Sequence, residues 1–243
     1  MQLNGDIELK EILIRDYKKD TLISVGELNS SIISFKNLYN SKLNFGDIDI
    51  QDLVFNLKTY AGETDTNLDV FVAKFDDDNP RVGPSKFLFS SSDVSIENGI
   101  FRLIDENLET PKVFEFSKLN ANTTNFLING PNVSSRINTF SFLDSRGIAV
   151  ENLKANFEYT LDYMNFGNLN IKTEQSELKG DLRFNYKRED LKYFTDKVNV
   201  EAKFKDSDIS LTELNVFFDE FGVNQRAILN ADLSGTLNNL FAS

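Results

Sequence analysis

Two stretches of the sequence decide the fold. Residues 46–57 read Gly-Asp-Ile-Asp-Ile-Gln-Asp-Leu-Val-Phe-Asn-Leu, and residues 92–103 read Ser-Asp-Val-Ser-Ile-Glu-Asn-Gly-Ile-Phe-Arg-Leu. In both, apolar side chains alternate with polar ones, which is typical of a β-strand with one apolar face. Each alternation is interrupted by one step of three, which reverses its phase. A strand that keeps the same face apolar needs a bulge or tight turn there, and Asn98-Gly99 suits that role.

The same unit recurs along the chain at intervals of about 40 to 60 residues, which is too irregular for a propeller and too long for a tight solenoid coil. In four of the five copies an Asp stands directly before the first apolar residue: Asp6, Asp47, Asp93 and Asp208. The fourth copy, residues 148–157, lacks it. The shared offset suggests that successive copies lie in similar register.

Alternation with polar partners continues through most of the chain, whereas a parallel sheet covered on both faces would show continuous apolar runs. We therefore expect an all-β fold built from an elongated, curled antiparallel sheet with a few short helices. Three helices are predicted: one capped by Thr66, one opening at Glu189-Asp190, and one capped by Thr212 with an apolar stripe that ends at Phe221. We expect one continuous unit over residues 1–243, with the best candidate for an internal break at 76–84, and the chain looks cut from something longer.

The composition argues against enzymatic catalysis and metal binding. The 243 residues include no His and no Cys, which removes the commonest general base, thiol nucleophiles and the usual zinc ligands. No nucleophile elbow or phosphate loop is present. We therefore expect no enzymatic activity, no catalytic residue, no bound metal and no cofactor. A net charge of −12 without a basic cluster makes nucleic acid an unlikely partner, and no apolar run approaches the roughly 20 residues of a membrane-spanning helix.

The apolar face is the informative feature, and it has two interpretations. It is either the core of a closed sandwich, acting as a structural or adhesive module that binds protein or carbohydrate, or an open trough that holds acyl chains. Periodicity alone does not separate them. In the trough interpretation the lining is Ile7, Leu9, Ile48, Ile50, Phe55, Val94, Ile96, Phe101, Ile148, Val150, Leu169 and Ile171.

The C-terminal third carries a family resemblance. It contains Ser-Glu-Leu-Lys-Gly-Asp-Leu-Arg-Phe-Asn-Tyr from Ser176, then Arg-Glu-Asp-Leu at 188–191, a strand with Ser-Asp-Ile-Ser-Leu at 207–211, and Leu-Ser-Gly-Thr-Leu-Asn-Asn-Leu at 233–240. Residues 46–48 and 60–69 add to it. The order of these motifs resembles the TamB and AsmA-like family of bacterial periplasm-spanning proteins, in its Flavobacterium-like form.

The resemblance implies a fold and a function. Members of this family are anchored in the inner membrane, span the periplasm and carry a curled sheet, called a β-taco, lined with apolar side chains. They are implicated in moving phospholipids to the outer membrane and in outer-membrane protein assembly with a BamA-family barrel. This chain lacks the anchor and the C-terminal part that meets the barrel. The resemblance thus implies an internal segment of a periplasmic lipid-conducting groove whose partners are phospholipid acyl chains.

The absence of His and Cys generates a direct prediction. Titration of the purified chain with Zn²⁺ or Ca²⁺ in a calorimeter should show no tight stoichiometric binding, because acids alone at these spacings do not build the usual sites. Stoichiometric binding of either ion would contradict the expectation.

Overall fold

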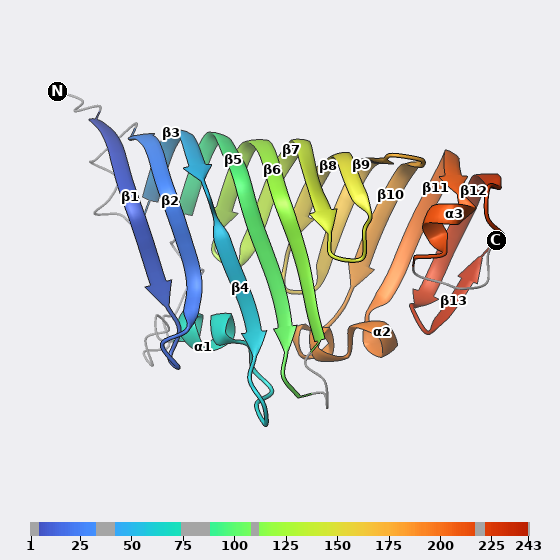
Figure 1. Cartoon of the computed structure of the whole chain (residues 1–243), viewed down its shortest axis with the longest axis horizontal. Helices are drawn as coiled ribbons and strands as arrows, with labels where there is room; N and C mark the ends of the chain where they lie inside the picture. The colour runs from blue at the N-terminus through green and yellow to red at the C-terminus, as the bar shows by residue number, and fades with distance from the viewer. Residues whose placement is uncertain (1–4, 33–41, 74–87, 108–111, 217–221, 243) are drawn as a thin grey trace.

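A computed structural model describes residues 5–32, 42–73, 88–107, 112–216 and 222–242. Its strands join into one 13-stranded sheet, which confirms the expected all-β, elongated and curled fold (Figure 1). The strands are β1 (Gly5–Arg15), β2 (Thr21–Ile32), β3 (Lys42–Gln51), β4 (Val54–Thr59), β5 (Leu88–Asp105), β6 (Lys112–Asn129), β7 (Asn132–Asp144), β8 (Ala149–Tyr159), β9 (Tyr163–Thr173), β10 (Glu177–Asn185), β11 (Asn199–Ser210), β12 (Arg226–Thr236) and β13 (Asn239–Ala242).

The strands follow one another along the sheet nearly in sequence order and pair antiparallel, with one exception. β3 and β4 form one broken strand that pairs parallel to β5, so the sheet is mixed rather than wholly antiparallel. The register is constant: Lys42 pairs with Leu88, Ile50 with Ile96, and Thr59 with Asp105. The second and third sequence copies therefore lie side by side in matching register, as their shared offset predicts.

In the first three sequence copies, the step of three in the apolar alternation falls at a residue with a left-handed backbone conformation. Glu11, Asp52 and Asn98 have φ of 53°, 53° and 54°, and each stands directly before the residue that resumes the alternation in its copy. L-residues adopt this conformation at a cost, and as single residues it is typical of bulges. A left-handed residue thus marks the phase change in each of the first three copies, and it lets the same face stay apolar there.

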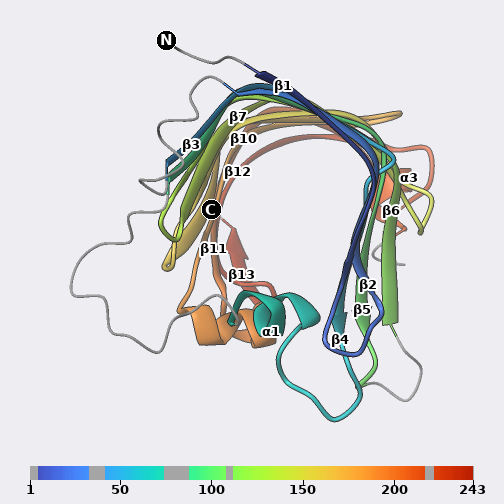
Figure 2. The same ribbon diagram turned by 90° about the vertical axis from the view of Figure 1, so that its left-hand side faces the viewer.

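The bulges also bend the sheet. Viewed along its long axis, the sheet is an arch with two arms joined by a rounded top (Figure 2). β5 and β6, the longest strands at 18 residues each, run from one arm over the top into the other. β6 carries two left-handed residues, Lys118 with φ of 51° and Asn125 with φ of 54°. The side-chain alternation thus changes phase twice in this strand, which matches the two bends between the arms and the top of the arch.

At several left-handed residues, the backbone N–H donates a hydrogen bond to a side chain on a neighbouring strand. The backbone N–H of Asn98 donates to Asn120 Oδ1 at 3.1 Å. Farther along the sheet, Asn168 N–H donates to Asp181 Oδ1 at 2.8 Å, and Asp206 N–H to Asn230 Oδ1 at 2.9 Å. Asn168 and Asp206 are also left-handed. Each of these bends is therefore held by a short polar side chain on the next strand, which spares the amide an unmade hydrogen bond.

Two of the short helical segments lie near the lower margin of the sheet, on the open side of the arch, and the third lies higher, beside β11 (Figures 1 and 2). The predicted first helix is present as α1 (Asn67–Ala73), and Thr66 caps it through reciprocal hydrogen bonds with Asp69. The second is a 3₁₀ turn, η2 (Arg188–Tyr193), followed by α2 (Phe194–Lys197). α3 (Leu211–Leu214) begins after Ser210 rather than at Thr212, and Phe221 and residues 76–84 lie outside the described ranges.

The bend at Asn98 can be tested by comparing two variants. Both Asn98→Gly and Asn98→Val remove the hydrogen bond that the amide group donates to Asp52 Oδ1 at 2.6 Å. Only valine also adds the steric cost of a β-branched residue at φ of 54°. We expect Asn98→Val to be less stable than Asn98→Gly by about 1–2 kcal/mol in urea unfolding. Equal stabilities would show that the left-handed conformation is not required there.

Candidate functional site: the concave face of the sheet

Cross-strand pairing brings the apolar side chains of different copies into continuous rows. Residues that pair across a sheet project from the same face. One row crosses seven strands: Ile7, Ser30, Ile48, Val94, Thr123, Ile137 and Ala155. A second crosses six: Leu9, Leu28, Ile50, Ile96, Ala121 and Phe140.

Other predicted lining residues pair with apolar partners on neighbouring strands. Phe55 pairs with Phe101, Val150 with Phe142, and Ile171 with Leu153. Leu169 stands two residues before Ile171 on β9 and shares its face. Ile148 directly precedes β8, in the β7–β8 connection, where its carbonyl accepts a hydrogen bond from Asp144 N–H.

Phenylalanine rows on this face were only partly predicted. On one arm of the arch, Phe55 contacts Phe101, Phe101 stacks on Phe116, and Phe116 meets Phe142, with ring centroids 5.2–6.0 Å apart. A second row links Phe157, Phe166, Phe184 and Phe194 from β8 to α2, with centroids 5.1–6.5 Å apart. The sequence shows that these residues are apolar, but their meeting depends on strand pairing across the whole sheet.

Burial identifies the apolar face as the concave one. On β11, Val200 and Ala202 are 4% and 3% exposed, while the alternating Glu201 and Lys203 are exposed. The described residues form a single sheet, so curvature itself crowds the apolar side. This crowding is incomplete. Ile48, Val150 and Leu169 are buried, Leu9 is 47% exposed, and the other predicted lining residues are half-buried. A face covered by a second sheet would bury nearly all of them.

A polar cluster lies at the end of one arm, and no sequence pattern predicted it. Asp16, in the β1–β2 turn, is 6% exposed. Its Oδ1 accepts the backbone amides of Lys18 and Asp20. Its Oδ2 accepts Tyr60 Oη at 2.7 Å and Asn67 Nδ2 at 3.2 Å. The cluster fastens the turn to β4 and α1, which places α1 beside the open side of the arch.

Electrostatics support a positioning role for this cluster. Burial first, and then hydrogen bonds to Asp16 and Asp20, raise the pKa of Tyr60 well above its ordinary value of 10.0. Lys58 Nζ lies 3.2 Å from Asp20 Oδ2 and 2.7 Å from Glu106 Oε1. The hydroxyl of Tyr60 is therefore a fixed donor at neutral pH, and its role is to hold the carboxylate of Asp16.

The described residues offer few candidates for any other kind of functional site. Within the described ranges, no three His, Cys, Asp or Glu side chains gather in a way that could hold a metal ion. None of the helices formed by the described residues has the length and apolar character needed to cross a bilayer. Comparison of the sequence with protein-family models and with curated proteins gives no match. The concave apolar face is thus the candidate functional surface.

The polar cluster predicts a stability change. In Tyr60→Phe, the buried carboxylate of Asp16 loses one donor, which should lower the free energy of unfolding by about 1–3 kcal/mol. Tyr193→Phe is the control, because Tyr193 is 55% exposed. Because the folded-state pKa of Tyr60 is raised, its contribution should be complete below pH 10 and decline as the pH rises toward that folded value. A Tyr60→Phe protein as stable as wild type at pH 8 would contradict this role.

Proposed function

We propose that this chain is a segment of a lipid-conducting groove that holds phospholipid acyl chains against its concave apolar face. One observation carries the proposal: most of the side chains that line the concave face stay half-buried, although they form rows across the sheet that are apolar except at Ser30 and Thr123. Apolar area left in water is unfavourable at about 25 cal/mol per Å². A contiguous surface of this kind is typical of a binding site for an apolar ligand.

The physical role follows from the cost of moving a lipid through water. Each exposed CH₂ group costs about 0.8 kcal/mol, so two acyl chains face a large barrier. A groove lined with Ile, Val, Leu and Phe removes most of that barrier along its length. The open side between the arms leaves room for polar head groups to stay hydrated (Figure 2). No step requires a catalytic group, so we propose transport by binding rather than an enzymatic activity.

The charge distribution is compatible with this role. Side chains on the opposite, convex face are polar: Asp49 and Glu97 are exposed, and Ser95 bonds to Asp93 and Asn122. The net charge of −12 would oppose binding to an anionic membrane surface. It does not oppose contact with tails, because acyl chains are uncharged.

The cellular setting is proposed from the sequence resemblance alone. In that setting the full protein is anchored in the inner membrane and crosses the periplasm. It passes phospholipid toward the outer membrane, supports outer-membrane biogenesis and meets a BamA-family barrel. The structural or adhesive alternative calls for a closed sandwich, whereas the described residues form one sheet, which favours the groove.

Photo-crosslinking tests the proposed face with matched neighbours. Ile50 pairs with Ile96, and the adjacent Asp49 pairs with Ser95, so the two pairs occupy the same place on opposite faces of the sheet. A photoreactive residue at 50 or 96 should capture phospholipid from mixed vesicles, and one at 49 or 95 should not. Equal capture from both faces, or none from 50 and 96, would refute the acyl-chain groove.

A charge on the concave face tests the groove in a second way. Ile96 is half-buried, so an Ile96→Asp carboxylate can reach water when the groove is empty, and the chain should stay folded. Lipid capture should fall, because a charge among acyl chains is costly. Ser95→Asp on the convex face is the matched control and should capture lipid normally. Global unfolding of Ile96→Asp in circular dichroism would instead indicate a closed core.

A further inference from the structure

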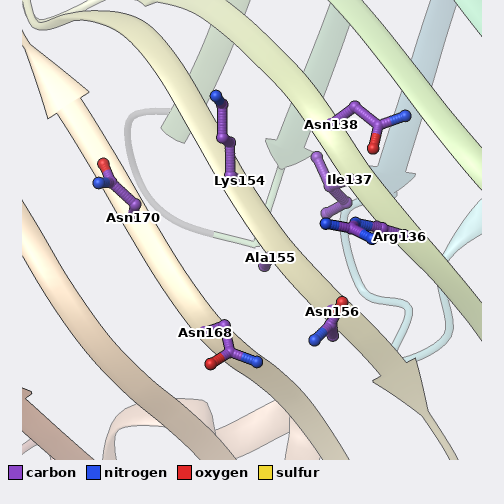
Figure 3. Close-up of a pocket in the computed structure, with 8 residues that line it drawn as sticks. All are labelled: Arg136, Ile137, Asn138, Lys154, Ala155, Asn156, Asn168 and Asn170. Carbon is purple, nitrogen blue, oxygen red and sulfur yellow. The ribbon is translucent and has the colours of Figure 1, made fainter.

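The convex face of the sheet carries a polar cavity that the groove does not use. The cavity measures about 480 Å³ and spans β7, β8 and β9 (Figure 3). Ile137 and Ala155 contribute to its lining, but their side chains belong to the concave row. The remaining lining residues are two cations and four amides: Arg136, Lys154, Asn138, Asn156, Asn168 and Asn170.

The two cations line the same cavity and have no carboxylate partner among the described residues. Arg136 pairs with Asn156, which is two residues from Lys154 along β8. Diagonal neighbours of this kind lie about 7–8 Å apart. Among the described residues, neither cation makes a salt bridge or a side-chain hydrogen bond, although acids outnumber bases by 38 to 26 in the chain. Two adjacent positive charges without partners repel each other unless an anion binds between them.

The amides add directed donors. The side chains of Asn156 and Asn168 have no hydrogen-bond partner among the described residues, so their NH₂ groups are free to donate. Asn138 and Asn170 are already oriented by bonds to Asn122 and Glu177. Two carboxylates of the next strand lie beside the cavity and already have partners: Glu177 accepts from Asn170 and pairs with Lys179, and Asp181 accepts the backbone amide of Asn168. No carboxylate lines the cavity.

From this arrangement we infer that the cavity is a binding site for a phosphate-type oxyanion. A guanidinium, an ammonium and free amides are the donor set that recognises phosphate oxygens. No aromatic ring lines the cavity, which disfavours a neutral sugar that would stack on one. The sheet itself separates the site from the concave face, so the head group of a lipid held in the groove cannot reach it. The phosphate group that binds belongs either to a small solute or to lipid head groups of an adjacent bilayer.

The test follows backbone amide chemical shifts during titration with inorganic phosphate. We expect saturable shifts confined to residues 136–138, 154–156 and 168–170. An Arg136→Gln and Lys154→Gln double variant should weaken binding at least about tenfold, since both charge-assisted contacts are lost. The matched control is Lys10→Gln with Lys172→Gln. It removes the same charge, but from lysines paired with Glu8 and Glu151, and should change the affinity less than about twofold.

Vesicle co-sedimentation distinguishes the two sources. Binding to phosphatidylglycerol vesicles that phosphate displaces and the site variant abolishes would assign the site to lipid head groups. Phosphate binding without vesicle binding would assign it to a free solute. The inference is overturned if neither probe binds, or if the control variant weakens binding as much as the site variant. Groove-directed crosslinking is unaffected by any of these outcomes, because it reports the opposite face.

Discussion

The left-handed backbone at Glu11, Asp52 and Asn98 is the constraint on which the rest of this structure depends. A flat strand with unbroken alternation would present the same face to the same side along its whole length. A chain that must turn a corner has to insert an extra residue, and the phase of its side chains then reverses. Because each of these three copies places its step of three at that residue, the concave side remains apolar through the bend.

As a consequence for packing, the sheet buries its apolar face only through its own curvature. A sandwich buries its apolar face against a second sheet about 10 Å away. Here the described residues form one layer, and curvature alone covers the apolar rows in part. Polar side chains on neighbouring strands hold the bends, and the Asp16 cluster fastens one arm to α1. The fold thus leaves a contiguous apolar surface available to a ligand.

Much of the sheet could be predicted from local pattern, because alternation and phase change are local properties. The phase changes after Ile50 and Ile96, and the face shared by Ile48 with Ile50 and by Val94 with Ile96, are of this kind. Other features depend on which strands become neighbours. The parallel pairing of β3 with β5, the meeting of Phe101 with Phe116, and the bond from Tyr60 to Asp16 all join residues whose proximity no periodicity encodes. The convex cavity is of the same kind, since Arg136 on β7 and Asn168 on β9 line it together only because β8 pairs with both strands.

The central claim is that the half-buried rows of the concave face bind phospholipid acyl chains. Native mass spectrometry of the purified chain after exposure to phospholipid vesicles tests it most directly. We expect a series of peaks displaced from the apo mass by whole phospholipid molecules, which collisional activation strips from a chain that remains folded. A folded chain that shows only its apo mass, at lipid concentrations that load a known lipid-binding protein, would refute acyl-chain binding.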